Sequence, residues 1–323
     1  MSETTGPVRF RCILAAVDFS PESDRALAWA ERMAADRGAE LRLVHALAWD
    51  ESPDVLAAFD RSMLEDLVAE ARARLAALAA RLREKVRSVD YDVKLGPAPR
   101  VILDEAAAHH AELVVLGTRG LRGWRHLLLG STAQRVISHA QCPVLAVHGN
   151  DPLPPERSWR LLAATDGSPE AGQALRAAAL LFAPGPADIV LLRAFEPPPV
   201  FYSGGGEVAT YQVVAGARAA ADGQLTQEAR ALAAEGIDVR PLLRDGFPPE
   251  VIVDAVAELQ VDLVVLGSRG LGAVAHALMG STAERVAQRA PAPVLVVPRR
   301  AGAALQEAGE ALAIVGASAD EEC

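Results

Sequence analysis

The 323-residue chain alternates between short, almost continuous apolar runs and longer segments in which apolar residues recur every three or four positions. The first pattern predicts buried strands, and the second predicts helices that bury one face. In the first half of the chain, strands are predicted at residues 12–17, 41–47, 91–95, 113–116 and 144–147. In the second half, strands are predicted at residues 161–164, 189–195, 239–243, 263–266 and 294–297.

Helices are predicted between these strands. Ser20 is a suitable N-cap for the first helix, with Pro21 at its first position. Further helices are expected at about residues 54–88, 100–110 and 131–139. Aliphatic strands separated by helices indicate a parallel sheet covered on both faces. In such sheets, ligands bind beyond the carboxyl ends of the strands, where the chain direction across the sheet reverses.

The two halves of the chain repeat each other. Residues 113–136 and 263–286 are identical at 16 of 24 positions at a fixed offset of 150. Residues 13–20 correspond to residues 161–168 at an offset of 148. The repeat is therefore one whole domain per half rather than a short solenoid unit.

Composition marks the boundaries of the two copies. The segment 149–155 is rich in proline and turn-forming residues, which is typical of a linker. After residue 300 the alternating pattern is lost, and the chain becomes rich in alanine and glycine. We expect one domain at 1–150, a second at 151–300, and a disordered tail or one loose helix at 301–323.

Charge and cysteine content limit the kinds of partner and the cellular compartment that we expect. A formal net charge of −10 argues against broad nucleic-acid binding. The three cysteines form no CxxC pair, which favours a reducing compartment. No apolar run approaches the roughly 20 residues of a membrane-spanning helix, and no signal-peptide pattern is seen. We expect a cytoplasmic protein that does not cross a membrane.

A glycine pattern follows the fourth strand of each half. Glycine lets backbone N–H groups approach a phosphate, and a helix N-terminus offers unpaired N–H groups and a positive dipole. The pattern G-x2-G-x9-G-[ST] therefore predicts a phosphate cradle, twice. Its residues are Gly117, Gly120, Gly130, Ser131 and Thr132 in the first half, and Gly267, Gly270, Gly280, Ser281 and Thr282 in the second.

Other interpretations of these residues stay open. Ser131 with Gln134, and Ser281 with Glu284, also fit a capping box, which needs no ligand. The loop residues Arg119 and Arg269 could neutralise phosphate charge or be solvated. The same choice applies to His126 and His276, which recur before the end of the loop.

The ends of the first two strands in each half complete the candidate site. The first strand ends at Asp18 or Asp166, whose carboxylate could accept hydrogen bonds from a ribose or reach a phosphate-bound metal. Either carboxylate could equally cap the following turn. The second strand ends near Ala46 or Ala194, where a small side chain leaves room for a flat base.

These motifs together resemble the universal stress protein family, over residues 8–148 and 158–298. The resemblance implies an α/β fold with two tandem, doubly wound, five-stranded parallel sheets of order 3-2-1-4-5, similar to the adenine nucleotide alpha hydrolases. It implies ATP, with or without Mg²⁺, bound between the first and fourth strands. The implied contacts are Ala16, Asp18, Ala46, Leu116, Gly117, Arg119, Gly120, Gly130, Ser131 and Thr132, and in the second copy Ala164, Asp166, Ala194, Leu266, Gly267, Arg269, Gly270, Gly280, Ser281 and Thr282. It also implies that the copies pair through their final strands within one chain, and allows a homodimer.

Three functions remain compatible with the sequence. The first, which we expect, is a non-enzymatic ATP-binding regulator of the stress response, in which nucleotide shifts the population of a form that binds an unidentified protein partner. The second is a slow ATPase or phosphotransferase, for which Asp18 or Asp166 would have to serve as base. The third is a nucleotide-free interaction module.

Overall fold

The computed structural model describes residues 11–47, 61–118, 129–151, 158–182, 188–197, 207–270, 279–299 and 301. The chain divides into two compact units, whose described parts are residues 11–151 and 158–301. We call them domain 1 and domain 2. The predicted linker is described only up to residue 151, and the predicted tail only at residue 301.

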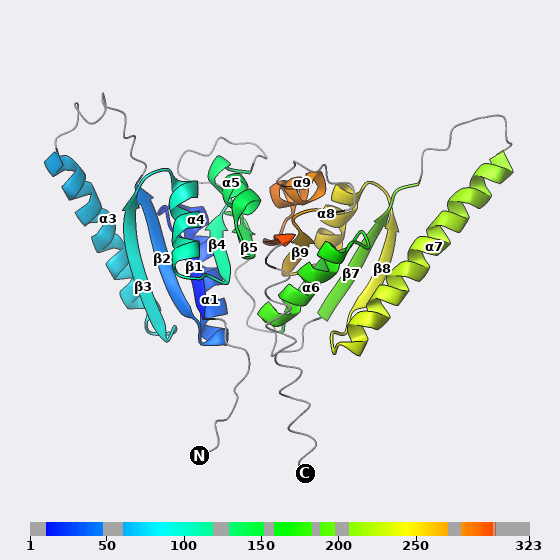
Figure 1. Cartoon of the computed structure of the whole chain (residues 1–323), viewed down its shortest axis with the longest axis horizontal. Helices are drawn as coiled ribbons and strands as arrows, with labels where there is room; N and C mark the ends of the chain where they lie inside the picture. Colours follow the sequence, from blue (N-terminus) through cyan, green and yellow to red (C-terminus); the bar gives the residue numbers. More distant parts are fainter. Residues whose placement is uncertain are drawn as a thin grey trace, which may run out of the picture. The chain divides into compact units, whose positions relative to one another are not determined.

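Domain 1 is a doubly wound parallel sheet with strand order β3-β2-β1-β4-β5. Helices α1 and α3 pack on one face of the sheet, and α4 and α5 pack on the other (Figure 1). The elements are β1 (Cys12–Ala16), α1 (Pro21–Arg37), β2 (Glu40–Leu47), α3 (Arg61–Leu82), β3 (Ser88–Leu95), α4 (Ala98–Ala108), β4 (Leu113–Gly117), α5 (Ser131–His139) and β5 (Val144–Val147).

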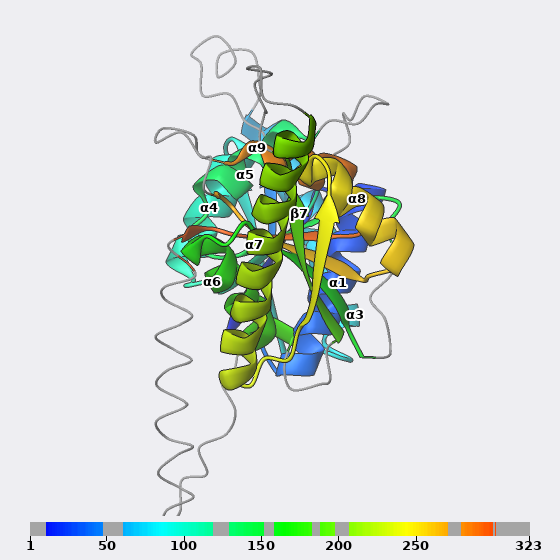
Figure 2. The ribbon, with the colours of Figure 1, turned by 90° about the vertical axis from the view of Figure 1, so that its right-hand side faces the viewer.

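Domain 2 repeats this arrangement, with strand order β8-β7-β6-β9-β10. The long helix α7 packs along β7 and β8, and Figure 2 shows it upright in front of the sheet. The elements are β6 (Arg160–Ala164), α6 (Pro169–Phe182), β7 (Asp188–Phe195), α7 (Glu207–Ala234), β8 (Arg240–Asp245), α8 (Pro248–Leu259), β9 (Leu263–Gly267), α9 (Ser281–Arg289) and β10 (Val294–Val297).

The predicted fold class is confirmed, and each predicted strand has a counterpart within three residues of its predicted ends. The reason is that central parallel strands are buried on both faces, so they must be continuously apolar. The four residues from Leu113 to Leu116, for example, are at most 2% exposed. Of the predicted 54–88 helix, residues 54–60 lie outside the described residues and Arg61–Leu82 is helical. Its predicted end is wrong, because residues 83–87 form a turn and β3 begins at Ser88.

Helix ends follow from local sequence. Ser20 is the N-cap of α1, where its side chain accepts a hydrogen bond from the N–H of Ser23, and Pro21 opens the helix. Gly38, at φ 62°, ends the same helix in the left-handed conformation that glycine adopts without strain. The predicted start of the first helix is therefore confirmed.

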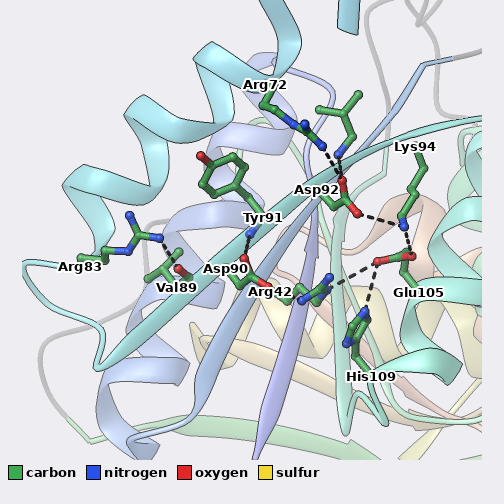
Figure 3. Close-up of polar contacts among 11 residues, drawn as sticks. Arg42, Arg72, Arg83, Val89, Asp90, Tyr91, Asp92, Lys94, Glu105 and His109 are labelled. Atoms are coloured by element: carbon green, nitrogen blue, oxygen red, sulfur yellow. Dashed lines mark hydrogen bonds and ion pairs between the residues drawn. The ribbon is translucent and has the colours of Figure 1, made fainter. Parts of the chain in front are cut away.

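Domain 1 buries a cluster of charged side chains between its sheet and α4 (Figure 3). Arg42 on β2 is 9% exposed, and Glu105 on α4 is 7% exposed. Glu105 lies 3.5 Å from Arg42 Nε, 3.3 Å from Lys94 Nζ and 3.5 Å from His109 Nε2. Arg42 also contacts Asp90 at 2.5 Å. Glu105 is therefore the shared counter-ion of this cluster.

Domain 2 has no such cluster at the aligned positions. At the offsets of the repeat, Arg42 aligns with Val190 and Glu105 with Ala255, which are 2% and 0% exposed, while His109 aligns with Leu259. The sheet face under α8 is thus apolar at these positions, and the charged contact between α8 and its sheet is the bidentate Arg244–Glu258 pair at the surface.

Candidate functional site

A cavity of about 420 Å³ opens at the carboxyl ends of β6, β7 and β9 in domain 2. Its volume lies in the range of small-molecule pockets, and its place is where doubly wound sheets bind ligands. Every second-copy residue that the resemblance implied is on its wall: Ala164, Asp166, Ala194, Leu266, Gly267, Arg269, Gly270, Gly280, Ser281 and Thr282. The structure therefore brings these residues together, and their contact with a nucleotide stays a prediction.

The sequence reasoning missed the rest of the wall. These residues are Thr165, Ala171, Leu192, Glu196, Pro248, Ile252, Ser268 and Ala283. Most are small or apolar and carry no motif, so only their position at the strand ends and helix starts could have indicated them. Ala194 and Pro248, which are partly exposed, and Ile252 add apolar groups to the wall on which a flat ring can pack.

The N-terminus of α9 opens into this cavity without a side-chain cap. Gly280 is the N-cap residue, and its own N–H donates to the carbonyl of Ser268 at 2.8 Å. The carbonyl of Gly280 accepts the N–H of Glu284. The N–H groups of Ser281, Thr282 and Ala283 find no acceptor within the described ranges, as expected for a first helical turn. They are available to an anion in the cavity.

The capping-box alternative is wrong in both domains. Ser281 and Ser131 are the first helical residues rather than N-caps, and the N-caps are Gly280 and Gly130, which have no side chain. The pattern of a serine followed three residues later by Gln or Glu is present, but the helix starts one residue too early for it. Backbone conformation, which the pattern does not encode, decides the difference.

Packing explains why some of the motif positions are glycine, but not all of them. A Cβ on Gly117 would lie 3.1–3.2 Å from the backbone of Glu22 and Ser23, and one on Gly267 would lie 3.3 Å from the carbonyl oxygen of Glu170. These two glycines are needed because the first turn of α1 or α6 packs against them. A Cβ on Gly280 would meet nothing closer than 3.4 Å. Glycine at 280 is therefore not explained by packing.

Asp166 has a structural contact and also faces the cavity. Its Oδ1 accepts the N–H of Ser168 at 3.0 Å, which fixes the turn after β6. A Cβ on Gly270 would collide with Oδ2 of Asp166, so the carboxylate lies directly against the glycine loop. Asp18 makes the matching turn contacts with Ser20, at 3.0 Å to the N–H and 2.5 Å to Oγ. The predicted turn-capping role is therefore confirmed, and a ligand contact by the same carboxylate stays a prediction.

The side chains that pack next to the end of the first strand differ between the two domains. Thr165 Oγ1 donates to Glu228 on α7 at 3.0 Å, and burial raises the pKa of the Glu228 carboxyl, against the opposing effects of this hydrogen bond and of Arg193. In domain 1, Phe19, at φ 61°, packs between His45 and Arg74, with ring centroids 4.7 Å apart and the guanidinium carbon 3.8 Å from the Phe19 ring centroid. These packing partners had no signal in the sequence.

The described part of the domain 1 site occupies the same strand ends. Ala16 and Asp18 lie at the end of β1, Ala46 near the end of β2, and Leu116 and Gly117 at the end of β4. Gly130, Ser131 and Thr132 form the start of α5, where the N–H of Gly130 donates to the carbonyl of Thr118 at 2.7 Å. Outside the described residues lie Arg119, Gly120, His126 and His276.

Within the described ranges, no three His, Cys, Asp or Glu side chains gather in a way that could hold a metal ion. No helix that the structure describes combines the length and apolar character needed to span a bilayer.

The fold and the site define a class: a two-domain α/β protein with doubly wound parallel sheets and a ligand-sized cavity at strand ends. The model of the universal stress protein family matches residues 9–148 and again residues 159–298. The chain belongs to the universal stress protein family, with two copies of its domain in tandem. The predicted family is thereby confirmed.

Relatives and a solved structure agree with this assignment. A universal stress protein of Mycolicibacterium smegmatis is 28% identical over 302 residues, which cover 89% of this chain and 97% of the relative. Universal stress protein Rv2623 of Mycobacterium tuberculosis is 31% identical over 296 residues, covering 88% of this chain and 95% of the relative. The crystal structure of a universal stress protein from Archaeoglobus fulgidus aligns with a TM-score of 0.63 at 20% identity, over 90% of this chain and 98% of that chain, and this likeness supports the fold.

Proposed function

We propose that this protein is an ATP-binding regulator of the stress response, with one nucleotide site in each domain. The observation that carries the proposal is the uncapped N-terminus of α9, which opens into the domain 2 cavity beside Gly280. Three consecutive backbone N–H groups and the hydroxyls of Ser281 and Thr282 suit a polyphosphate. Arg269 on the same wall adds a positive charge.

The remainder of the cavity suits a nucleoside. Asp166, between β7 and β9 on the wall, is placed to accept hydrogen bonds from ribose hydroxyls. Ala194, Pro248 and Ile252 offer apolar groups for a base. Mg²⁺ would reach the site with the phosphates of ATP rather than through a set of protein ligands.

We propose a binding role rather than a catalytic one. The described wall of the cavity contains no histidine, lysine or cysteine that could serve as base or nucleophile. One oxygen of Asp166 already accepts the N–H of Ser168. Regulation then follows from linkage: ATP stabilises the form of the protein that binds it, and any partner that prefers this form is favoured with it.

Replacing Gly280 by alanine tests the proposal. The methyl group fits the ligand-free protein, because its nearest neighbour would be Ser268 O at 3.4 Å, but it occupies space where the phosphates would approach. We expect Gly280→Ala to lose one equivalent of bound ATP per chain in calorimetric titration. Loss of glycine at the N-cap should lower stability by no more than about 1 kcal/mol.

Gly223→Ala is the matched control, because Gly223 lies on α7 with no atom near its Cβ position. This variant should keep the ATP stoichiometry and the ATP-induced rise in melting temperature that a folded-state ligand must produce. Full retention of ATP binding by Gly280→Ala would refute the assignment of the phosphate site. A wild-type melting temperature that does not respond to millimolar ATP would refute nucleotide binding altogether. Gly117 and Gly267 are unsuitable positions for this test, because both pack against a helix backbone and a larger residue would disturb the fold itself.

A further inference from the structure

The two ends of the domain 2 cavity differ in charge. At the β9 end lie Arg269 and the N-terminus of α9, which favour an anion. Glu196 directly follows β7, whereas Asp166 follows β6 in between and has its carboxylate against Gly270 of the glycine loop. β7 pairs with β6, and β6 pairs with β9, so β7 is about 10 Å from β9 at ordinary strand spacing. The wall therefore has a positive end and an acidic end on opposite sides.

Glu196 is the charged wall residue that distinguishes the two copies of the domain. Of the three charged residues in the described wall, Asp166 aligns with Asp18 and Arg269 aligns with Arg119. Glu196 aligns with Ala48, which lies outside the described residues. Glu196 directly follows β7 and is exposed, so a change of its side chain should leave the sheet undisturbed.

We propose that Glu196 makes the domain 2 site selective for nucleotides that carry phosphate at one end only. This inference rests on the proposed function, since it assigns the phosphates to the α9 end. A carboxylate accepts hydrogen bonds from hydroxyl and amino groups, as a free ribose or a base provides, but it repels a second phosphate placed near it. Asp166 has a counterpart, Asp18, in domain 1, so the difference between the two domains rests on Glu196.

The charge of Glu196 is the part that can be removed without changing the shape of the site. Because Glu196 is exposed, water and salt screen its field, so we expect a difference of a few-fold rather than a complete block. For the same reason, the difference should shrink as ionic strength rises. In domain 1, the aligned alanine carries no charge, so we expect that site to discriminate less.

ADP and adenosine 3′,5′-bisphosphate form the matched pair of probes. Both contain adenosine and two phosphates, but only the second carries phosphate at both ends. Binding is measured by calorimetric titration of the full chain with Gly130→Ala, which blocks the phosphate cradle of domain 1. We expect ADP to bind about tenfold more tightly than the bisphosphate, because ADP places both phosphates at the cradle while the bisphosphate places one there and one on the 3′ side of the ribose, towards the acidic end. The part of this ratio that depends on Glu196 is what the following variant measures.

In the Glu196→Gln variant of this chain, the ratio of the two affinities should fall about threefold, mainly because the bisphosphate binds better. Glu250→Gln is the control, since Glu250 is an exposed residue of α8 outside the cavity wall and the change alters the net charge equally. The control should keep the wild-type ratio. Raising the salt from about 50 to about 500 mM should reduce the effect of Glu196→Gln.

An unchanged ratio in Glu196→Gln, with ADP still bound, would overturn this inference alone. An equal fall of the ratio in Glu250→Gln would also overturn it, because net charge rather than the position of Glu196 would then explain the effect. If neither nucleotide binds to the parent chain, the proposed function fails and this inference fails with it.

Discussion

Glu105 is the residue at which one substitution tests the buried charge cluster of domain 1. The Glu105→Ala variant installs the residue that domain 2 has at the aligned position, Ala255. It removes the shared counter-ion of Arg42 and Lys94, which, like His109, lie within 3.5 Å of the carboxylate (Figure 3). The question is how much of domain 1 stability depends on this carboxylate.

The magnitude follows from burial and from the contacts that remain. Removing one partner of a buried ion pair typically costs about 3–5 kcal/mol, because the other charge is left uncompensated. Here Arg42 keeps Asp90 at 2.5 Å, and Lys94 keeps Asp92 at 2.9 Å. The Arg42 Nε and Glu105 Oε2 atoms also form no aligned hydrogen bond with any described group. We therefore expect the lower end, about 3 kcal/mol, which corresponds to a fall of roughly 6–12 °C in melting temperature.

The assay is a double-mutant cycle followed by thermal and urea unfolding. Arg42→Val installs the domain 2 residue Val190 at the second position. If Arg42 and Glu105 stabilise each other, the double variant should be at least about 1 kcal/mol more stable than the sum of the single variants predicts. Glu258→Ala is the control, because its bidentate pair with Arg244 lies on the surface of domain 2, and it should change the melting temperature little.

Two results would refute this reasoning. One is a cost below about 1 kcal/mol for Glu105→Ala, which would mean that solvent or rearrangement compensates Arg42. The other is strict additivity of Arg42→Val and Glu105→Ala, which would mean that the two charges are not energetically coupled.

Two stability predictions concern α7. Gly223→Ala should raise stability by about 0.5–1 kcal/mol in urea unfolding, because Gly223 lies inside an exposed helix with open space at its Cβ position, and a loss of stability would contradict this. For Glu228, burial raises the pKa of its carboxyl in the folded protein above the usual 4.5, so its ionisation costs stability as the pH rises from about 4.5 through the folded pKa. Glu228→Gln should therefore melt roughly 1 °C or more above the wild type at pH 7.5, with no such gain at pH 4, and melting temperatures that differ equally at both pH values would count against it.

The apolar pattern and the internal repeat were enough to predict the fold and the edge of the sheet that carries the candidate site. Buried parallel strands must be apolar along their whole length, so the apolar runs located them. Because the two halves repeat each other, each prediction made for one half also applied to the other. Since the carboxyl ends of parallel strands share one edge of a sheet, residues as distant as Asp166 and Ser281 could be assigned to one site from their positions in the chain alone.

The tertiary structure decided which atoms meet at that edge and why. The sequence could not say whether Ser281 or Gly280 caps α9, because the serine pattern is the same in both cases and backbone conformation settles it. It could not separate Gly267, which packs tightly against α6, from Gly280, where a Cβ would make only ordinary contacts.

Nor could the sequence pair Arg42 with Glu105, or place Glu196 on the cavity wall. The spacing of apolar residues along a stretch of chain indicates which positions in it are buried. The identity of the partner depends on strand register and on how each helix crosses the sheet. Those two features exist only once the chain has folded, which is why the contacts that set charge and selectivity were visible only in the structure.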